Sequence, residues 1–377
     1  MNAGDPLLHL DGAVEAEGHG VPAHFGSPLA EQRALEAGDA LLSLGHHGVI
    51  TVAGADRLSW LNSMTSQHLL TLQPGSSTET LLLDANGRIE RVMRLVDDGE
   101  RAWLLVDEGD AAPLTEFLMR MRFALRVEVA DVSAEYLTIA TFDGGTAAAA
   151  LRELQPVAEW RDPWGEIAPG GVQYASGEHP AEGWAALQFV LPRAAGERIA
   201  ELVRVGGTGA AGLLALDALE VQAWRPSRHG EVDERSIPHE LDWMRTAVHL
   251  TKGCYRGQET VAKVHNLGHP PRRLAQLHLD GFGGELPESG ALVYLATEVD
   301  DPDARPVGRI TRAVLHHEWG GIALALLKRS VPEDAALAVR LGDTGASVAA
   351  GQEVIVPASA GGTRRERIAA NFSRHRG

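Results

Sequence analysis

The spacing of apolar residues predicts a mixed α+β architecture for residues 26–271. Leu29, Leu35 and Leu41 lie on or near one face of a helix predicted over 28–44. Asp56 is a cap residue for a second helix. Asn86-Gly87 joins two apolar segments, which is a strong hairpin signal. Further predicted elements are strands at 49–52, 78–84, 89–96 and 102–106, and helices at 111–121, 146–154, 192–205 and 213–224.

After Pro271 the pattern changes to short alternating segments separated by turns rich in Gly, Pro and Asp. Such spacing is typical of a small all-β barrel or sandwich. We therefore expect a C-terminal β-barrel domain over 272–358. Its predicted strands are 273–279, 291–295, 307–315, 322–327 and 337–341.

The two ends of the chain carry weaker patterns. Residues 1–25 have no clear period and many Gly, Pro and acidic residues, so we expect a loose leader. Residues 359–377 hold five arginines after a Gly-rich stretch and predict a disordered basic tail. An RNA-binding arm is the alternative for this tail.

Composition excludes several classes of protein. The 377 residues contain one cysteine, which excludes an internal disulfide framework and a conventional Fe–S site within one subunit. A net charge of −17 argues against broad nucleic-acid binding. No apolar run is long enough for a membrane span, and the acidic N-terminal segment does not resemble a secretory signal. We expect a cytoplasmic protein.

The single cysteine lies in the segment Lys252-Gly253-Cys254-Tyr255-Arg256-Gly257-Gln258-Glu259. Nearby cations and a following helix favour the thiolate form of a cysteine, which is the reactive form. A short helix is predicted over 258–266. The alternative is a small buried hydrophobic residue, and local chemistry alone favours neither reading.

This segment resembles the signature of the YgfZ-type folate-binding proteins, a branch of the glycine-cleavage T-protein (aminomethyltransferase) superfamily. Three further segments resemble the same family: an N-terminal strand-turn-helix, the "D-x-x-G-x-I" hairpin and the "IP-x-E" segment. They run over 52–67, 82–89 and 236–240. Together the four segments extend the resemblance from about residue 45 to about residue 330.

The resemblance implies two α+β subdomains around a central folate pocket, followed by the barrel. It also implies a tetrahydrofolate-binding accessory protein that supports Fe–S cluster assembly or repair in client enzymes, including tRNA-modifying ones. The expected partners are folate and Fe–S client or assembly proteins, with no membrane partner. Cys254 would be the working residue.

Two positions depart from the family pattern. Arg91, next to Glu90, stands where aminomethyltransferases carry a carboxylate, which argues against aminomethyl transfer because a fixed cation cannot act as a base. Gln222 stands where the family has a glutamate that contacts the pterin, and an amide can still form hydrogen bonds there. Trp224 is a candidate stacking wall, with a core aromatic as its alternative.

The remaining expected folate contacts lie in the cysteine segment: Lys252, Tyr255, Arg256, Gln258 and Glu259. Cations there suit the carboxylates of a folate tail. Arg225 is another candidate cation, although a solvated surface position is favoured for it.

Four of the histidines are candidates for metal ligands and two for partners of Cys254. The His46-His47 and His316-His317 pairs lack the i, i+4 spacing of a helical zinc site and predict no metal. His239 and His265 flank the cysteine segment and could form a Cys–His pair with Cys254. Two other functions therefore stay open: a folate-dependent aminomethyltransferase or one-carbon transferase, and a folate-independent thiol transferase.

Overall fold

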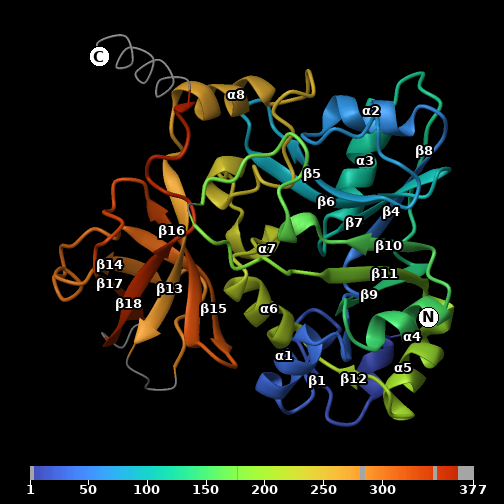
Figure 1. The fold of residues 1–377 in the computed structure, drawn as a ribbon, viewed down its shortest axis with the longest axis horizontal. Coiled ribbons are helices and arrows are strands. Elements are labelled where there is room, and N and C mark those ends of the chain that lie inside the picture. The colour runs from blue at the N-terminus through green and yellow to red at the C-terminus, as the bar shows by residue number, and fades with distance from the viewer. Residues whose placement is uncertain (1–3, 176, 281–284, 343–345, 364–377) are drawn as a thin grey trace.

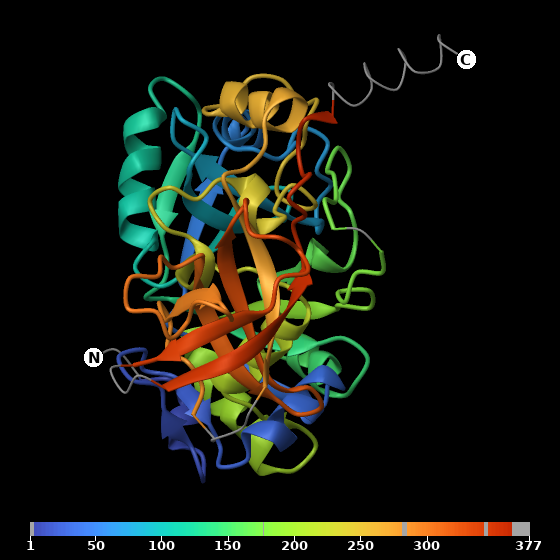
Figure 2. The same cartoon turned by 90° about the vertical axis from the view of Figure 1, so that its left-hand side faces the viewer.

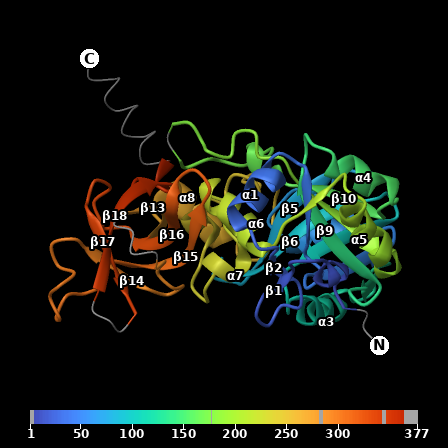
Figure 3. The same cartoon turned by 90° about the horizontal axis from the view of Figure 1, so that it is seen from below.

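A computed structural model describes residues 4–175, 177–280, 285–342 and 346–363. The chain forms two α+β units and a β-barrel, and Figure 1 shows the barrel, in orange and red, beside the two units. Seen from below, the barrel forms one end of the molecule (Figure 3), and in the view from its own side it lies in front of the two units (Figure 2). The α+β class and the closed barrel predicted from the sequence are confirmed.

The first unit is an antiparallel five-stranded sheet in the order β5-β6-β7-β4-β8. Its apolar face is covered by two helices, and the buried residues Trp60, Leu61, Leu104 and Leu114 lie in one cluster between sheet and helices. The elements are β4 (Gly48–Ala53), α2 (Arg57–Met64), β5 (Ser77–Leu83), β6 (Ile89–Asp97), β7 (Arg101–Val106), α3 (Ala111–Met121) and β8 (Glu128–Asp131).

The second unit is a five-stranded sheet in the order β10-β11-β9-β3-β12. Only the pairing of β3 with β12 is parallel among the described strand pairs of this sheet. The elements are β3 (Ala40–Ser43), β9 (Tyr136–Phe142), β10 (Ala158–Arg161), β11 (Ala186–Pro192), β12 (Gly209–Ala210), α1 (Pro28–Glu36), α4 (Ala147–Glu153), α5 (Gly196–Arg204) and α6 (Leu213–Gln222), with 3-10 turns at Pro163–Gly165 (η2) and Arg193–Ala195 (η3).

Two predictions for this region are wrong. The helix expected over 28–44 ends at Glu36, because Gly38 turns the chain at φ +75° and residues 40–43 enter the sheet. The leader expected to be loose is packed where the structure describes it: Leu7 is fully buried with Leu41 and Ile199. It contains η1 (Pro6–His9), β1 (Val14–Glu15) and β2 (Pro22–His24), elements too short to show a period in the sequence.

The barrel closes in the order β13-β16-β15-β14-β17-β18, and β13 pairs with both β16 and β18. Its strands are β13 (Arg272–Asp280), β14 (Leu292–Leu295), β15 (Gly308–His316), β16 (Gly320–Lys328), β17 (Leu337–Leu341) and β18 (Ala346–Val354). The short helices α7 (Arg228–Glu231), η4 (Pro238–Leu241) and α8 (Gln258–Leu267) lie before β13 in the chain.

The largest buried cluster lies where the three units meet. It joins Val92 of β6, Val221 of α6 and Leu324 of β16 around Trp164 and Trp243. A division of the chain near residue 271 into separate domains remains a prediction, since side chains from both sides of that point share this core. Most of the basic tail expected over 359–377 lies outside the described residues. No helix in the described part of the chain has both the length and the apolar character needed to cross a membrane.

Candidate functional site

The cysteine segment packs directly on the predicted hairpin. Gly257 has φ +84°, and a Cβ atom there would lie 2.6 Å from the Asp84 carbonyl oxygen and 2.9 Å from the Gly87 Cα. Both distances are shorter than van der Waals contact, so only glycine fits this backbone crossing. Two sequence motifs about 170 residues apart therefore form one structural unit.

Ion pairs fix the charged residues beside this crossing. An Arg256 guanidinium nitrogen lies 2.9 Å from the Glu90 carboxylate. Arg91 turns to a different partner, with Nε 3.1 Å from Asp110 Oδ1. Arg91, which the sequence resemblance aligns with the aminomethyltransferase carboxylate, is thus a cation paired with Asp110.

Lys252 holds the cysteine segment against the C-terminal end of α2. Its ammonium donates hydrogen bonds to the carbonyl oxygens of Asn62, Thr65 and Gln67. Burial lowers the pKa of Lys252 to about 7, whereas the three carbonyl acceptors favour the charged form. Because all three donors are used, Lys252 positions the loop, and the folate contact expected of it stays a prediction.

Cys254 is exposed at the start of this segment. Gly253 beside it has φ +103°, and a Cβ atom there would meet no atom within 4 Å. The thiol is therefore accessible, which removes the alternative of a small buried core residue. The neighbouring Tyr255 is buried, and burial raises its pKa. Gln258 and Glu259 form the first turn of α8.

The two flanking histidines are directed to other partners. His239 is fully buried, its Nε2 lies 3.0 Å from the Val261 carbonyl oxygen, and burial lowers its pKa to about 3. The Nδ1 atom of His265 lies 3.0 Å from the hydroxyl oxygen of Tyr174. Asp242 is also fully buried: it accepts a hydrogen bond from the Tyr174 amide, and burial raises its pKa to about 7. The buried, neutral His239 is unsuited to activate an exposed thiol.

A buried ion network lies at the centre of the molecule. Arg225 donates two hydrogen bonds to Glu79, at 2.9 and 3.2 Å, and one to Asp162 at 3.0 Å. Trp243 and Thr246 also donate to the Glu79 carboxylate. The solvated surface position favoured for Arg225 is therefore wrong, since its side chain is 4% exposed.

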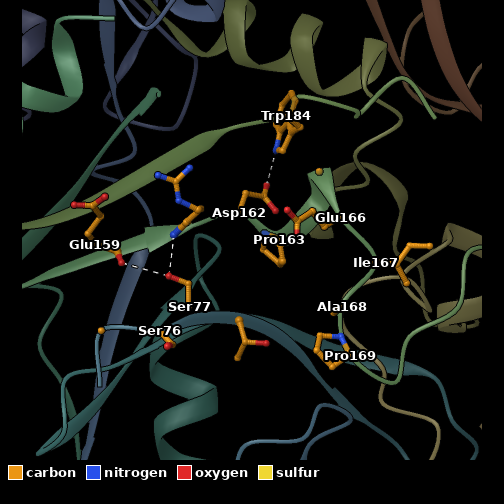
Figure 4. Close-up of a pocket in the computed structure, with 14 residues that line it drawn as sticks. Ser76, Ser77, Glu159, Asp162, Pro163, Glu166, Ile167, Ala168, Pro169 and Trp184 are labelled. Carbon is orange, nitrogen blue, oxygen red and sulfur yellow. Dashed lines mark hydrogen bonds between the residues drawn. The ribbon is translucent and has the colours of Figure 1, made fainter. Parts of the chain in front are cut away.

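Three cavities share lining residues along this network. The outer cavity, of about 750 Å³, lies between β5, β10 and the segment 162–169 (Figure 4). Asp162 and Trp184 also line a central cavity of about 20 Å³. The central cavity in turn shares Arg94 and Glu220 with a third cavity of about 310 Å³. We call it the acidic cavity after the four carboxylates in its lining, which also contains two arginines and four histidines.

One face of α6 lines the acidic cavity. Leu213, Leu216, Asp217 and Glu220 recur at helical spacing and all contribute to its wall. Gln222 is two residues beyond Glu220 and so lies on a different face of the helix.

Arg312 of the barrel binds two carboxylates of this wall and also Glu231 of α7. Its guanidinium nitrogens lie 2.5 Å from Glu220, 3.1 Å from Glu231 and 3.3 Å from Asp217. Three carboxylates thus share one guanidinium, and burial raises the pKa of Glu220 to about 7. The wall can accept hydrogen bonds from a ligand that carries amino or amidine groups.

Trp224 lies in the core shared by the three units. Its side chain is nearly fully buried, and the indole N–H donates a 2.9 Å hydrogen bond to Gln276 of β13. This geometry fits the core aromatic that was the alternative to a stacking wall. Among the described residues, no group of three or more His, Cys, Asp or Glu is placed to hold a metal ion.

Comparisons with known proteins agree with this architecture. No protein-family model matches the chain. The aminomethyltransferase T of the glycine cleavage system from Bartonella henselae has the same fold, with a TM-score of 0.72 over 93% of this chain and 96% of its own, at 19% identity.

Among curated relatives, the chain is similar to a mitochondrial Fe–S cluster assembly factor IBA57 homolog from Mycosarcoma maydis and to the tRNA-modifying protein YgfZ of Colwellia psychrerythraea. The first is 25% identical over 66% of this chain and the second 24% over 62%. These similarities support a YgfZ-type member of the T-protein superfamily.

An aminomethyltransferase from Rippkaea orientalis is 24% identical over 84% of this chain and 86% of its own length. The match spans 59% of the length of the IBA57 homolog and 70% of the YgfZ protein. The structural match thus establishes the fold, while the sequence identity is low for every relative named here.

Proposed function

We propose that this protein binds tetrahydrofolate and supports Fe–S cluster assembly or repair in client enzymes, including tRNA-modifying ones, with Cys254 as its working residue. One observation carries the proposal: an exposed thiol lies on a loop that packs against the family hairpin, within a T-protein fold. Relatives named for Fe–S assembly and for tRNA modification support this function at the level of the family.

The acidic cavity supplies groups that suit a folate. The pterin ring presents an amino group and a ring N–H along one edge, and carboxylates accept hydrogen bonds from such a pair. Asp217 and Glu220 would hold that edge. A bound tetrahydrofolate would supply a carrier for one-carbon units. The folate contacts predicted for Gln222, Trp224 and the cysteine segment stay predictions.

A calorimetric titration with tetrahydrofolate tests both binding and the identity of the pterin contact. We expect Glu220→Gln to weaken binding about tenfold, because the amide gives up a charge-assisted hydrogen bond. Gln222→Glu is the matched control on the same helix, and it should leave the affinity within about twofold if Glu220 holds the pterin. No heat at millimolar folate would refute folate binding. A tighter complex with Gln222→Glu would return the pterin contact to that residue.

The role of the thiol is tested separately. Cys254→Ser keeps nearly the same volume, so folding and folate affinity should survive. In cells that lack the native protein, we expect this variant to fail to restore the activity of an Fe–S enzyme. Full restoration would show that the loop acts through its shape and charge alone.

Aminomethyl transfer is the alternative function, favoured by relatives that carry that name over most of this chain. The Arg91–Asp110 ion pair opposes it, because the residue that the sequence resemblance aligns with the family carboxylate is a paired cation. An assay for methylene-tetrahydrofolate formation from an aminomethyl-lipoyl donor distinguishes the two functions, and we expect no product.

A further inference from the structure

Exposed apolar and basic side chains alternate at the end of α3 and in the loop that follows it. Met119, Met121, Phe123 and Leu125 are 50%, 38%, 81% and 43% exposed. Arg120, Arg122 and Arg126 stand between and after them. These seven residues are called the 119–126 surface below.

The backbone presents Phe123 outward in a fixed conformation. Its φ of +45° lies in the left-handed region, which costs a residue other than glycine on the order of 1–3 kcal/mol. Asp56 anchors the end of the loop, because its carboxylate accepts hydrogen bonds from the Arg126 amide and guanidinium at 2.8–3.1 Å. A Cβ atom at Gly54 would lie only 2.1 Å from the Arg126 carbonyl oxygen, so the two backbones are closely packed.

Helix α2 connects this surface to the cysteine segment. Asp56, which anchors the loop, immediately precedes α2, while the Asn62 carbonyl of α2 and the Thr65 carbonyl after it bind Lys252. Eight helical residues span about 12 Å. Figure 1 shows α2, α3 and β8 together in one corner of the first unit. A molecule docked on the 119–126 surface would therefore lie near the loop that carries Cys254.

The charges of the surface select the kind of partner. Glu116 and Asp56 pair with Arg120 and Arg126, and within the described part of the chain Arg122 has no carboxylate partner. One uncompensated cation on a chain of net charge −17 is too weak an attraction for an anionic membrane, where each cation contributes about 1 kcal/mol. Phenylalanine, methionine and arginine are, in contrast, the residues enriched at protein interfaces.

We propose that the 119–126 surface is the docking site for a partner protein that receives Phe123 in an apolar pocket and faces Arg122 with carboxylates. This inference goes beyond the proposed function and does not require folate binding. It concerns how a second protein is placed beside the cysteine segment.

Photo-crosslinking identifies the partner. A photoreactive phenylalanine analogue is placed at position 123 of the full chain in cells, and at Val205, which is 77% exposed at the end of α5, as a control. The captured protein is identified, purified and titrated against the wild type and the variants Phe123→Asn, Arg122→Glu and Val205→Ser. Asparagine is chosen because it tolerates a positive φ, so the loop should keep its conformation.

We expect Phe123→Asn and Arg122→Glu each to weaken the complex about tenfold or more, as for hot-spot residues, and Val205→Ser to change it less than twofold. Higher ionic strength should weaken the wild-type complex and leave that of Arg122→Glu less affected. Tetrahydrofolate affinity should be equal in wild type and Phe123→Asn, which separates a failure of this inference from a failure of folate binding.

Three outcomes would overturn the proposal. The first is equal crosslinking at positions 123 and 205. The second is an affinity for the captured protein that Phe123→Asn does not change. The third is a different occupant: a second copy of this chain as the sole crosslinked species, or co-sedimentation with phosphatidylserine vesicles that Phe123→Asn abolishes.

Discussion

Substitution of Gly257 tests whether the contact between the cysteine segment and the hairpin stabilises the fold. An alanine at φ +84° has a backbone cost of about 1–2 kcal/mol. Its Cβ atom would also lie 2.6 Å from the Asp84 carbonyl oxygen and 2.9 Å from the Gly87 Cα, and both are backbone atoms that move only with the hairpin. Overpacking of this kind costs a further 1–3 kcal/mol or so. We expect Gly257→Ala to lower the free energy of unfolding by about 2–5 kcal/mol in all.

The same segment contains a matched control. Gly253 has φ +103°, and a Cβ atom there would meet no atom within 4 Å. Gly253→Ala should therefore show the backbone cost alone, about 1–2 kcal/mol. Urea unfolding of both variants measures the difference, provided that the slope of free energy against urea is unchanged. Equal destabilisation of the two variants would show that the crossing relaxes freely and that the contact does not require glycine.

Three further predictions concern polar side chains. Glu79→Gln leaves the buried Arg225 with only part of its compensating charge and should cost about 3–5 kcal/mol in urea unfolding. Burial raises the pKa of Asp242 to about 7, above the value of about 4 in an unfolded chain, so its contribution to stability is lost as the pH rises through 7. Asp242→Asn should therefore stabilise the protein at pH 8 and have little effect near pH 4, and a stability difference independent of pH would contradict this. The Ser77 hydroxyl links the edge strands β5 and β10: it accepts a hydrogen bond from the Arg161 amide and donates one to the Glu159 carbonyl oxygen. Ser77→Ala should therefore lower the free energy of unfolding by about 1 kcal/mol.

Elements with strong local signals were predictable from the sequence. The hairpin at Asn86-Gly87, the helix α3 and the change to short strands after Pro271 all appear where expected. The strand β18 was not predicted, because its apolar positions are mostly alanine and give weak alternation. The helix predicted over 28–44 was too long, because Leu41 and Leu42 fit a helical face and a strand equally well.

The candidate site was predictable only in part, because most of its contacts join distant segments. The motif around Cys254 was evident locally, whereas local chemistry left its burial open and only the structure shows it exposed. The burial of Arg225 depends on Glu79, which is 146 residues away, and no local signal pairs them. The cavity face of α6 follows from helical geometry, but the ion pairs of its carboxylates with Arg312 of the barrel do not.

Arg312 also bears on how this protein can be dissected experimentally. The sequence suggests a cut near residue 271, which would release the barrel as a separate fragment. That cut would separate Glu231 from the Arg312 guanidinium and the Trp224 indole from its Gln276 acceptor. An N-terminal fragment without the barrel should therefore aggregate. Mixing the two separately expressed fragments should restore a folded protein.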